Sequence, residues 1–122
     1  MLIAAGVGAA YCVGKRYRRF EISGRSMLPG LHPGDWVLVD EWAYRSTPPV
    51  RGHVVVVTHP RELSRHLVKR VAYVDGSDEL RVEGDNLAES TDSREFGPVS
   101  ASLVVGRVRW RYWPLSRAGT VI

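Results

Sequence analysis

The chain contains one cysteine, Cys12, so it cannot form an internal disulfide bond. Cysteine and histidine do not occur at the spacing of a zinc site. We interpret the four histidines as surface or local hydrogen-bonding residues: His32, His53, His59 and His66. A length of 122 residues is enough for one domain whose modest core needs no disulfide. We therefore expect a single domain that uses no metal and no other cofactor.

The sequence also lacks a long hydrophobic run. Residues 2–14 are apolar, but these 13 residues include three glycines. As a helix they would span about 20 Å, against ~30 Å for the hydrocarbon core of a bilayer. The segment does not fit a secretory signal peptide, because no positive region precedes it, or a lipoprotein signal, because Tyr11 precedes the cysteine. We interpret residues 1–19 as a marginal membrane anchor, or the remnant of a longer one, and residues 20–122 as the functional domain.

Positive charge is concentrated behind this apolar segment. The chain has 17 basic and 13 acidic residues, a net charge of +4, and five of the cations form one cluster: Lys15, Arg16, Arg18, Arg19 and Arg25. Because no helix-turn-helix or RNA-module pattern accompanies them, they predict a membrane surface rather than nucleic acid as a partner. If the segment inserts, the positive-inside rule favours a cytoplasmic domain, and a cytoplasmic protein is the alternative localisation.

Lysine is scarce, with two lysines against fifteen arginines. Arginine cannot lose its proton in a protein, whereas a lysine in apolar surroundings can. Strand alternation places Lys69 on one face with Leu67, Val71 and Tyr73, all apolar neighbours. Burial there would lower the pKa of the amine and make it a usable base at neutral pH.

The rest of the chain predicts an all-β domain, because short β-branched runs alternate with turns and no convincing helical period follows residue 20. We expect a half-buried last strand in which Arg107, Arg109 and Arg111 form a solvated face, and a long functional loop over residues 84–99. The predicted strands are Trp36–Val39, His53–Thr58, His66–Val74, Leu80–Glu83 and Leu103–Trp113.

Ser26 lies between two turns rich in glycine and proline, where Pro29 and Pro33 stiffen the backbone. Such turns are ordinary in proteins, but a stiff loop also suits a nucleophile. A serine hydroxyl needs a neighbouring base to react. The absence of a Gly-x-Ser-x-Gly pattern favours Lys69 over a histidine as that base. Periodicity alone does not bring Ser26 and Lys69 together.

Four segments resemble, in order, the motif boxes of type I signal peptidases, which are membrane serine proteases with a Ser/Lys dyad. They are Ser26–Pro29, Gly52 with its β-run, Lys69–Val71 and Gly84–Val99. The match runs from about Ile22 to Val108. The resemblance implies a small signal-peptidase-like β-barrel or sandwich that hydrolyses peptide bonds without a cofactor.

The resemblance also implies roles for single residues. Ser26 matches the nucleophile and Lys69 the general base of the family. Ser90 matches a second serine that orients the lysine amine, and Asp92 and Arg94 match a supporting ion pair.

The family's oxyanion hole combines the N–H of the nucleophile, here Ser26, with a donor two residues earlier. Some relatives have a serine at that earlier position. This chain has Gly24 there, so only the backbone could contribute the second donor.

Within the family, three stretches look most like nickel-type superoxide dismutase maturation proteases: Val54–Pro60, Gly84–Arg94 and Trp110–Pro114. This closer resemblance implies a protein substrate with an N-terminal leader, the nickel superoxide dismutase precursor. The alternatives are a general signal peptidase I, a relative of the self-cleaving SOS-type repressors, and an inactive membrane-anchored binding module.

Overall fold

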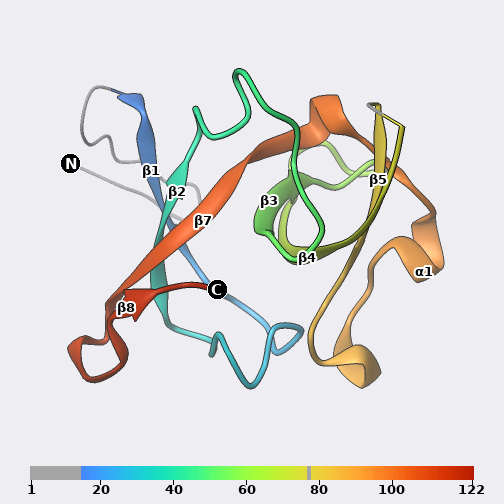
Figure 1. Ribbon diagram of the computed structural model, residues 1–122. Coiled ribbons are helices and arrows are strands. Elements are labelled where there is room, and N and C mark those ends of the chain that lie inside the picture. Colours follow the sequence, from blue (N-terminus) through green and yellow to red (C-terminus); the bar gives the residue numbers. More distant parts are fainter. Residues whose placement is uncertain (1–14, 77) are drawn as a thin grey trace.

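One antiparallel sheet of eight strands, curled into a half-barrel, makes up most of the molecule (Figure 1). The computed structural model describes residues 15–76 and 78–122. The strands are β1 (Tyr17–Glu21), β2 (Trp36–Asp40), β3 (Val54–Thr58), β4 (His66–Asp75), β5 (Glu79–Glu83), β6 (Val99–Ser100), β7 (Val104–Trp113) and β8 (Gly119–Thr120). The predicted all-β class is confirmed, and the five predicted strands each match a strand of the sheet.

The strand order is β1-β2-β7-β3-β4-β5-β6, with β8 paired to β7. Helical structure is limited to α1 (Ser93–Phe96) and the short 3-10 turns η3 (Leu87–Glu89), η4 (Ala101–Leu103) and η5 (Leu115–Arg117). The sequence 84–99, predicted as a loop, therefore contains η3, α1 and the short strand β6. Because β6 pairs with β5, this segment is tied to the sheet at its far end.

Strand β3 lies in the middle of the sheet and is apolar on both faces, as its β-branched run predicts. Val54 and Val56 pack in one hydrophobic cluster, and Val55 and Val57 pack in the other. The first cluster also holds residues of β1, β2, β7, the position just after β1 and the segment after Ser26: Phe20, Ile22, Met27, Leu31, Val37, Val39 and Val108. The second holds residues of β4, β5 and β6: Val71, Leu80, Val82 and Val99.

A register shift in β4 corrects one sequence expectation. Lys69 and Val71 are buried on the same face, with 3% and 1% exposure, but Tyr73 is 56% exposed. The pairing of β4 with β5 shifts between Val71 and Tyr73, and Val74 packs on the same cluster as Val71. Because an irregularity of one residue reverses the alternation, Tyr73 leaves the face predicted for it.

The sequence predicted that Arg107, Arg109 and Arg111 on β7 form a solvated face, but Arg111 does not lie free in solvent. Arg111 donates a hydrogen bond to the fully buried Asp35 at 3.1 Å and another to the carbonyl of Gly30 at 2.6 Å. Arg117 forms a second ion pair with the same carboxylate. Hydrogen bonds from these arginines and from the His32 N–H outweigh burial and lower the pKa of Asp35. This end of β7 therefore carries an ion cluster around a buried carboxylate.

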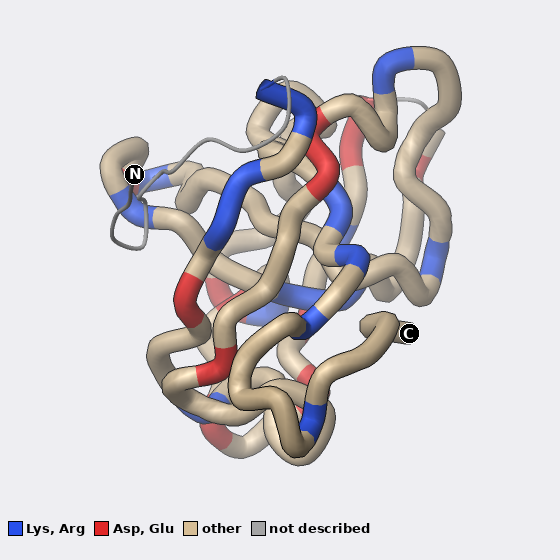
Figure 2. The backbone as a smooth tube through the Cα atoms, turned by 90° about the vertical axis from the view of Figure 1, so that its left-hand side faces the viewer, with Lys and Arg blue, Asp and Glu red and all other residues tan. Residues whose placement is uncertain are grey.

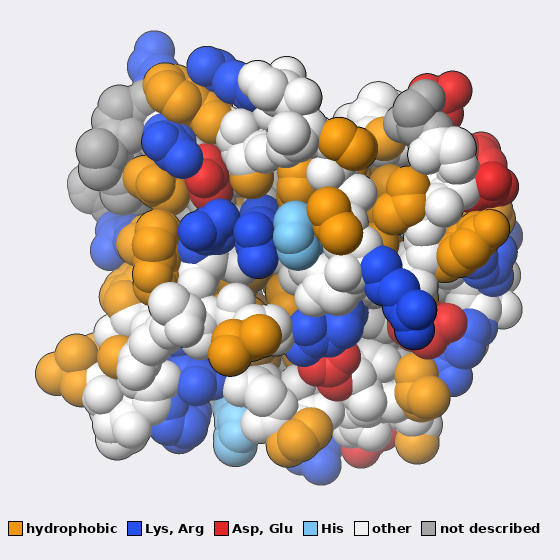
Figure 3. All heavy atoms as spheres, in the orientation of Figure 1, with side chains coloured by type: hydrophobic (Ala, Val, Ile, Leu, Met, Phe, Trp, Pro, Cys, Tyr) orange, Lys and Arg blue, Asp and Glu red, His pale blue; other side chains and the backbone are white. Residues whose placement is uncertain are grey.

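Residues 1–14 of the predicted anchor segment, which was expected over residues 1–19, lie outside the described residues. Within the part of the chain that is described, no helix is long and apolar enough to span a membrane. Carboxylates pair with three of the five clustered cations: Arg16 with Asp40, Arg18 with Glu41, and Arg25 with Glu89. Lys and Arg residues are spread over several elements, often beside acidic ones (Figure 2). On the face shown in Figure 3, basic, acidic and hydrophobic side chains are interspersed.

Candidate active site

A cleft of about 370 Å³ lies between the end of β1, the segment that follows it and the first half of β4. Ser26 and Lys69 both line this cleft, although 43 positions separate them in the sequence. Glu89 and Thr91, which flank Ser90, form a further part of the wall. The structure thus brings the two residues that the sequence singled out into one cavity.

The segment that carries Ser26 is anchored in the core on its C-terminal side. Met27 and Leu31 are buried in the first hydrophobic cluster, and the Leu31 N–H donates to the Met27 carbonyl at 3.0 Å. Farther along, the Asp35 cluster holds the Gly30 carbonyl and the His32 N–H. Ser26 itself remains half-buried at the cleft. Apolar side chains and the ion cluster around Asp35 thus fix the loop while its hydroxyl stays accessible.

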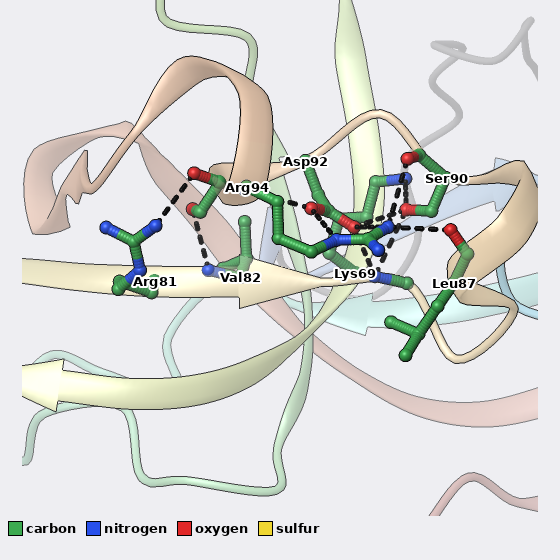
Figure 4. A network of polar contacts seen from close by, with 9 residues as sticks. Lys69, Arg81, Val82, Leu87, Ser90, Asp92 and Arg94 are labelled. Atoms are coloured by element: carbon green, nitrogen blue, oxygen red, sulfur yellow. Dashed lines mark hydrogen bonds and ion pairs between the residues drawn. The ribbon is translucent and has the colours of Figure 1, made fainter.

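Lys69 lines the cleft, and its amine donates a hydrogen bond to the Ser90 hydroxyl oxygen at 2.9 Å (Figure 4). Burial lowers the pKa of this amine. The carboxylate of Asp92 opposes that effect, while the cations of Arg65 and Arg94 lower the pKa further. The amine is therefore easier to deprotonate than an exposed lysine.

Asp92 is fully buried behind Ser90 and accepts the Ser90 hydroxyl proton at 2.6 Å. Its carboxylate also accepts from Nε of Arg94 at 3.0 Å and from the Gly84 N–H at 3.0 Å. Burial alone would raise the pKa of Asp92, but the hydrogen bonds from Arg94, Ser90 and Gly84 lower it well below its usual range. Asp92 is therefore a fixed anion, and it also caps the N-terminus of α1 through the Arg94 N–H.

The direction of the Ser90 hydrogen bonds decides what Lys69 can do. Because a hydroxyl has one proton and Ser90 gives it to Asp92, Ser90 can only accept from Lys69. A neutral amine has two protons and one lone pair, so donating to Ser90 leaves that lone pair available. The hydrogen bonds between Arg94 and the carbonyls of Leu87 and Ser90, at 2.8 and 3.2 Å, hold this arrangement in place.

Gly84 explains how the segment after β5 reaches the site. A Cβ atom at this position would lie 2.3 Å from the Ser90 Oγ and 2.6 Å from the Ser26 carbonyl oxygen. Real Cβ atoms are not found at such distances. Only glycine allows the backbone to pass between Ser90 and the loop of Ser26.

The two halves of the predicted dyad share the cleft without a direct hydrogen bond. Across residues 15–76 and 78–122, no hydrogen bond joins the Ser26 hydroxyl to Lys69, whose amine instead contacts Ser90. Catalytic hydrogen bonds are often long in unliganded enzymes and shorten when substrate binds. Gly24, the predicted second oxyanion position, has a φ of +116°, a conformation that favours glycine.

The histidines make local contacts, as expected from the sequence. The Tyr44 hydroxyl and Nδ1 of His53 lie 2.8 Å apart, Nδ1 of His59 accepts from the Arg61 N–H, and Nε2 of His32 contacts the Pro29 carbonyl. His66 lines the cleft. Among the described residues, His, Cys, Asp and Glu form no group of three or more that could hold a metal ion.

Sequence reasoning gave no role to two residues near the site. Arg65 lines the cleft and lowers the pKa of Lys69, but nothing in its local sequence distinguishes it. Asn86 binds the backbone on both sides of Ser26. It is the single asparagine of a chain that contains no glutamine, so this rarity could have marked it as a candidate functional residue.

Comparison with known proteins gives a family and several relatives. The family described as signal peptidase, peptidase S26, matches residues 1–78 and 74–113. The mitochondrial ATP-independent inner membrane protease subunit 1b of Arabidopsis thaliana is 37% identical, with 79% of this chain and 70% of its own covered. The mitochondrial inner membrane protease subunit 2 of Danio rerio is 34% identical, with 79% and 64% covered. The human mitochondrial inner membrane protease subunit 1 is 31% identical, with 80% and 70% covered.

These relatives are described as membrane protease subunits, and none of the three is a nickel superoxide dismutase maturation protease. The comparisons therefore do not support that closer resemblance, and they agree better with the general signal peptidase alternative. They also support a protease rather than a binding module. Both the motifs and the matched length lead to one conclusion: the chain belongs to the signal peptidase family, peptidase S26.

Proposed function

We propose that the protein is a Ser/Lys endopeptidase that removes an N-terminal leader from a membrane-associated partner protein. The observation that supports it best is a buried lysine of lowered pKa, held by a serine, in the cleft that a second serine lines. A pKa shift produced by burial in a cleft is typical of a catalytic base.

In the proposed acylation step, the neutral amine of Lys69 takes the proton of the Ser26 hydroxyl as Oγ bonds to the carbonyl carbon of the substrate. The carbonyl oxygen becomes an oxyanion, which the Ser26 N–H and the backbone at Gly24 would stabilise. The Lys69 ammonium then gives its proton to the leaving nitrogen as the peptide bond breaks. An acyl-enzyme on Ser26 and a free amine product result.

Deacylation repeats these proton transfers with water as the nucleophile. Lys69 takes a proton from water, the hydroxide adds to the acyl carbon, and the Ser26 oxygen leaves with the proton that Lys69 returns. Throughout, the Ser90 oxygen accepts one hydrogen bond from the Lys69 amine, and Asp92 orients Ser90 by accepting its hydroxyl proton. Asp92 and Arg94 therefore act as positioning residues that do not touch the substrate.

One wall of the cleft has an unpaired strand edge that could receive the substrate. The Val71 N–H and the Arg65 carbonyl both bond toward the β3 side of β4. Since alternate residues of a strand bond to opposite sides, His66 and Val68 direct their backbone groups away from β3. Strand β5 pairs with β4 only from Arg70 onward, so among residues 15–76 and 78–122 no strand pairs with this part of β4 on that side.

The facing wall is the outer edge of β1. Ile22 exchanges hydrogen bonds with the β2 side, donating to the Asp35 carbonyl and accepting from the Gly34 N–H. By the same alternation, the backbone groups of Glu21 and Ser23 face outward, and both residues line the cleft. An extended peptide between the two edges would gain backbone hydrogen bonds whatever its sequence, as the processing of leader segments requires.

The names of the relatives extend the proposal to location. They describe inner membrane proteases, and we propose membrane association for this protein too, with residues 2–14 as its attachment. Such a position would give the cleft access to leaders that are themselves bound at a membrane. A nickel superoxide dismutase precursor has no support among the relatives, so the proposal names the broader substrate class.

The test uses the full chain purified in detergent and a serine-reactive acylating probe. Wild-type protein should be labelled, whereas the Ser26→Ala variant should not. With a peptide ester substrate, Lys69→Arg should lose about 10⁴-fold or more in kcat, because it keeps the charge but removes the titratable amine. Labelling that persists in Ser26→Ala, or normal turnover in Lys69→Arg, would contradict the dyad. No labelling and no turnover in the wild type would favour the inactive binding module.

A further inference from the structure

Asn86 holds the backbone on both sides of the proposed nucleophile. Its main-chain N–H donates to the Ser26 carbonyl at 2.8 Å, and its side-chain Nδ2 donates to the Arg25 carbonyl at 3.0 Å. The Leu28 N–H also donates to the Arg25 carbonyl, at 3.2 Å. Two successive carbonyl groups are thus fixed by a single residue from the segment after β5.

A fixed carbonyl also fixes the N–H of the same peptide unit. In a planar trans peptide, the C=O of one residue and the N–H of the next point in opposite directions. The Arg25 carbonyl is turned toward Asn86, so the Ser26 N–H is turned away from it. In the part of the chain described by the structure, the Ser26 N–H has no hydrogen-bond partner. It is therefore an oriented donor without an acceptor.

We infer that Asn86 is a positioning residue for the oxyanion hole, and that its side-chain amide aims the Ser26 N–H at the developing negative charge. This inference rests on the proposed function. A preorganised donor is worth most where charge appears only in the transition state. Asn86 should therefore affect the chemical step more than the binding of the intact substrate.

The surroundings of Asn86 make it suited to this task. Its neighbour Asp85 forms a two-point ion pair with Arg70, with both contacts at 2.8 Å, and Gly84 lies against the Ser26 carbonyl. The Asn86 carbonyl accepts the Glu89 N–H at 3.0 Å, which fixes the turn that follows. Only a side chain with a donor can hold the Arg25 carbonyl, so an aspartate of the same shape would not replace the asparagine.

The experiment compares wild type with Asn86→Ala and Asn86→Asp, each as the full chain in detergent. The substrate is an alanine-rich peptide ester, and the inhibitors are the matching peptide aldehyde and peptide alcohol. The Ser26 oxygen adds to the aldehyde carbon, Lys69 takes the Ser26 proton, and the carbonyl oxygen becomes an oxyanion. The alcohol has no carbonyl at the position that Ser26 would attack and forms no oxyanion, so it reports ground-state binding alone.

Each Asn86 variant should lower kcat by about 10-fold or more with little change in KM, which is less than the loss from deleting a donor outright. Affinity for the aldehyde should fall by the same factor as kcat, and affinity for the alcohol should not change. Equal losses for aldehyde and alcohol, or unchanged kcat in both variants, would overturn the inference. If Asn86→Ala does not fold, Asn86→Asp alone decides between these outcomes.

Asp85→Ala is the matched control, because it lies in the same turn and removes the ion pair with Arg70 without touching the carbonyls beside Ser26. It should lower Tm but leave the ratio of aldehyde to alcohol affinity unchanged. A control that moves this ratio as much as Asn86→Ala would show a merely structural role. The failures are distinguishable: if Lys69→Arg turns over normally, the proposed function fails, whatever the Asn86 variants do.

Discussion

Two buried carboxylates, Asp35 and Asp92, have similar partners but different roles: Asp35 holds the loop that follows Ser26, and Asp92 orients Ser90 beside Lys69. Each has no exposed surface, accepts backbone N–H groups and pairs with arginine. Both cations that pair with Asp35 are arginines, which stay charged at neutral pH. Asp92 meets Arg94 and, through Ser90, the amine of Lys69, whose pKa is lowered. The comparison shows what separates a structural ion cluster from a candidate catalytic one. The Asp92 cluster includes a cleft residue, Lys69, whose amine can be deprotonated, whereas the cations that pair with Asp35 cannot.

The largest effects are expected from replacing the two carboxylates, because both variants should lose stability but only one should change the pH dependence of catalysis. Asp35→Asn and Asp92→Asn should each lower the free energy of unfolding by about 3 kcal/mol in chemical denaturation, since an amide group cannot accept all the hydrogen bonds that the buried carboxylate accepts. Only Asp92→Asn should also move the rising limb of the kcat/KM pH profile. That limb should move to lower pH, because the Asp92 carboxylate raises the pKa of Lys69. A shift of the limb in Asp35→Asn would contradict the distinction.

Two crowded glycines give a second, smaller contrast. Gly84→Ala would force a Cβ against Ser90 and the Ser26 carbonyl, and Gly106→Ala would force one to within 2.5 Å of the Asp40 carbonyl oxygen. Both variants should lose about 1–3 kcal/mol of stability through overpacking. Gly84→Ala should also lose roughly 100-fold in kcat per folded molecule, because it displaces the site. Gly106→Ala should retain its kcat, measured on the folded fraction; a similar loss there would mean that general strain, not the site, sets the rate.

The smallest effect is expected from replacing one arginine beside each carboxylate, Arg94 beside Asp92 and Arg117 beside Asp35. Arg94→Gln removes a cation that lowers the pKa of Lys69, so the rising limb of the pH profile should move to higher pH. Arg117→Gln removes a cation from the Asp35 cluster and should leave the limb in place. The measurement is kcat/KM against pH for the three proteins. A limb that moves to lower pH in Arg94→Gln would mean that the charges around Lys69 are misassigned.

The sequence predicted the sheet and the burial of Lys69 because both depend on local alternation. Four consecutive valines, as in β3, are typical of a strand covered on both faces, and the neighbours of Lys69 place it on an apolar face. The exposure of Tyr73 could not be predicted, since it depends on a register shift against β5 that no local pattern encodes.

The site required long-range information that the sequence does not contain. Ser26 and Lys69 line the same cleft because β1 and β4 form opposite walls of it, and strand order is a property of the whole sheet. Arg111 was expected in solvent, because its strand alternates correctly, but its partner Asp35 lies 76 residues away. The contacts of Asn86 with the Ser26 loop cross a similar gap in the sequence.

The outer edge of β1 forms one wall of the cleft, and the chain before β1 is the part proposed to attach to a membrane. From Tyr17 to Ser23 an extended chain covers about 20 Å. Any surface that holds the residues before Lys15 would therefore fix the depth at which a peptide is cut. Lengthening or shortening this single strand would change the distance between attachment point and scissile bond without altering a catalytic group.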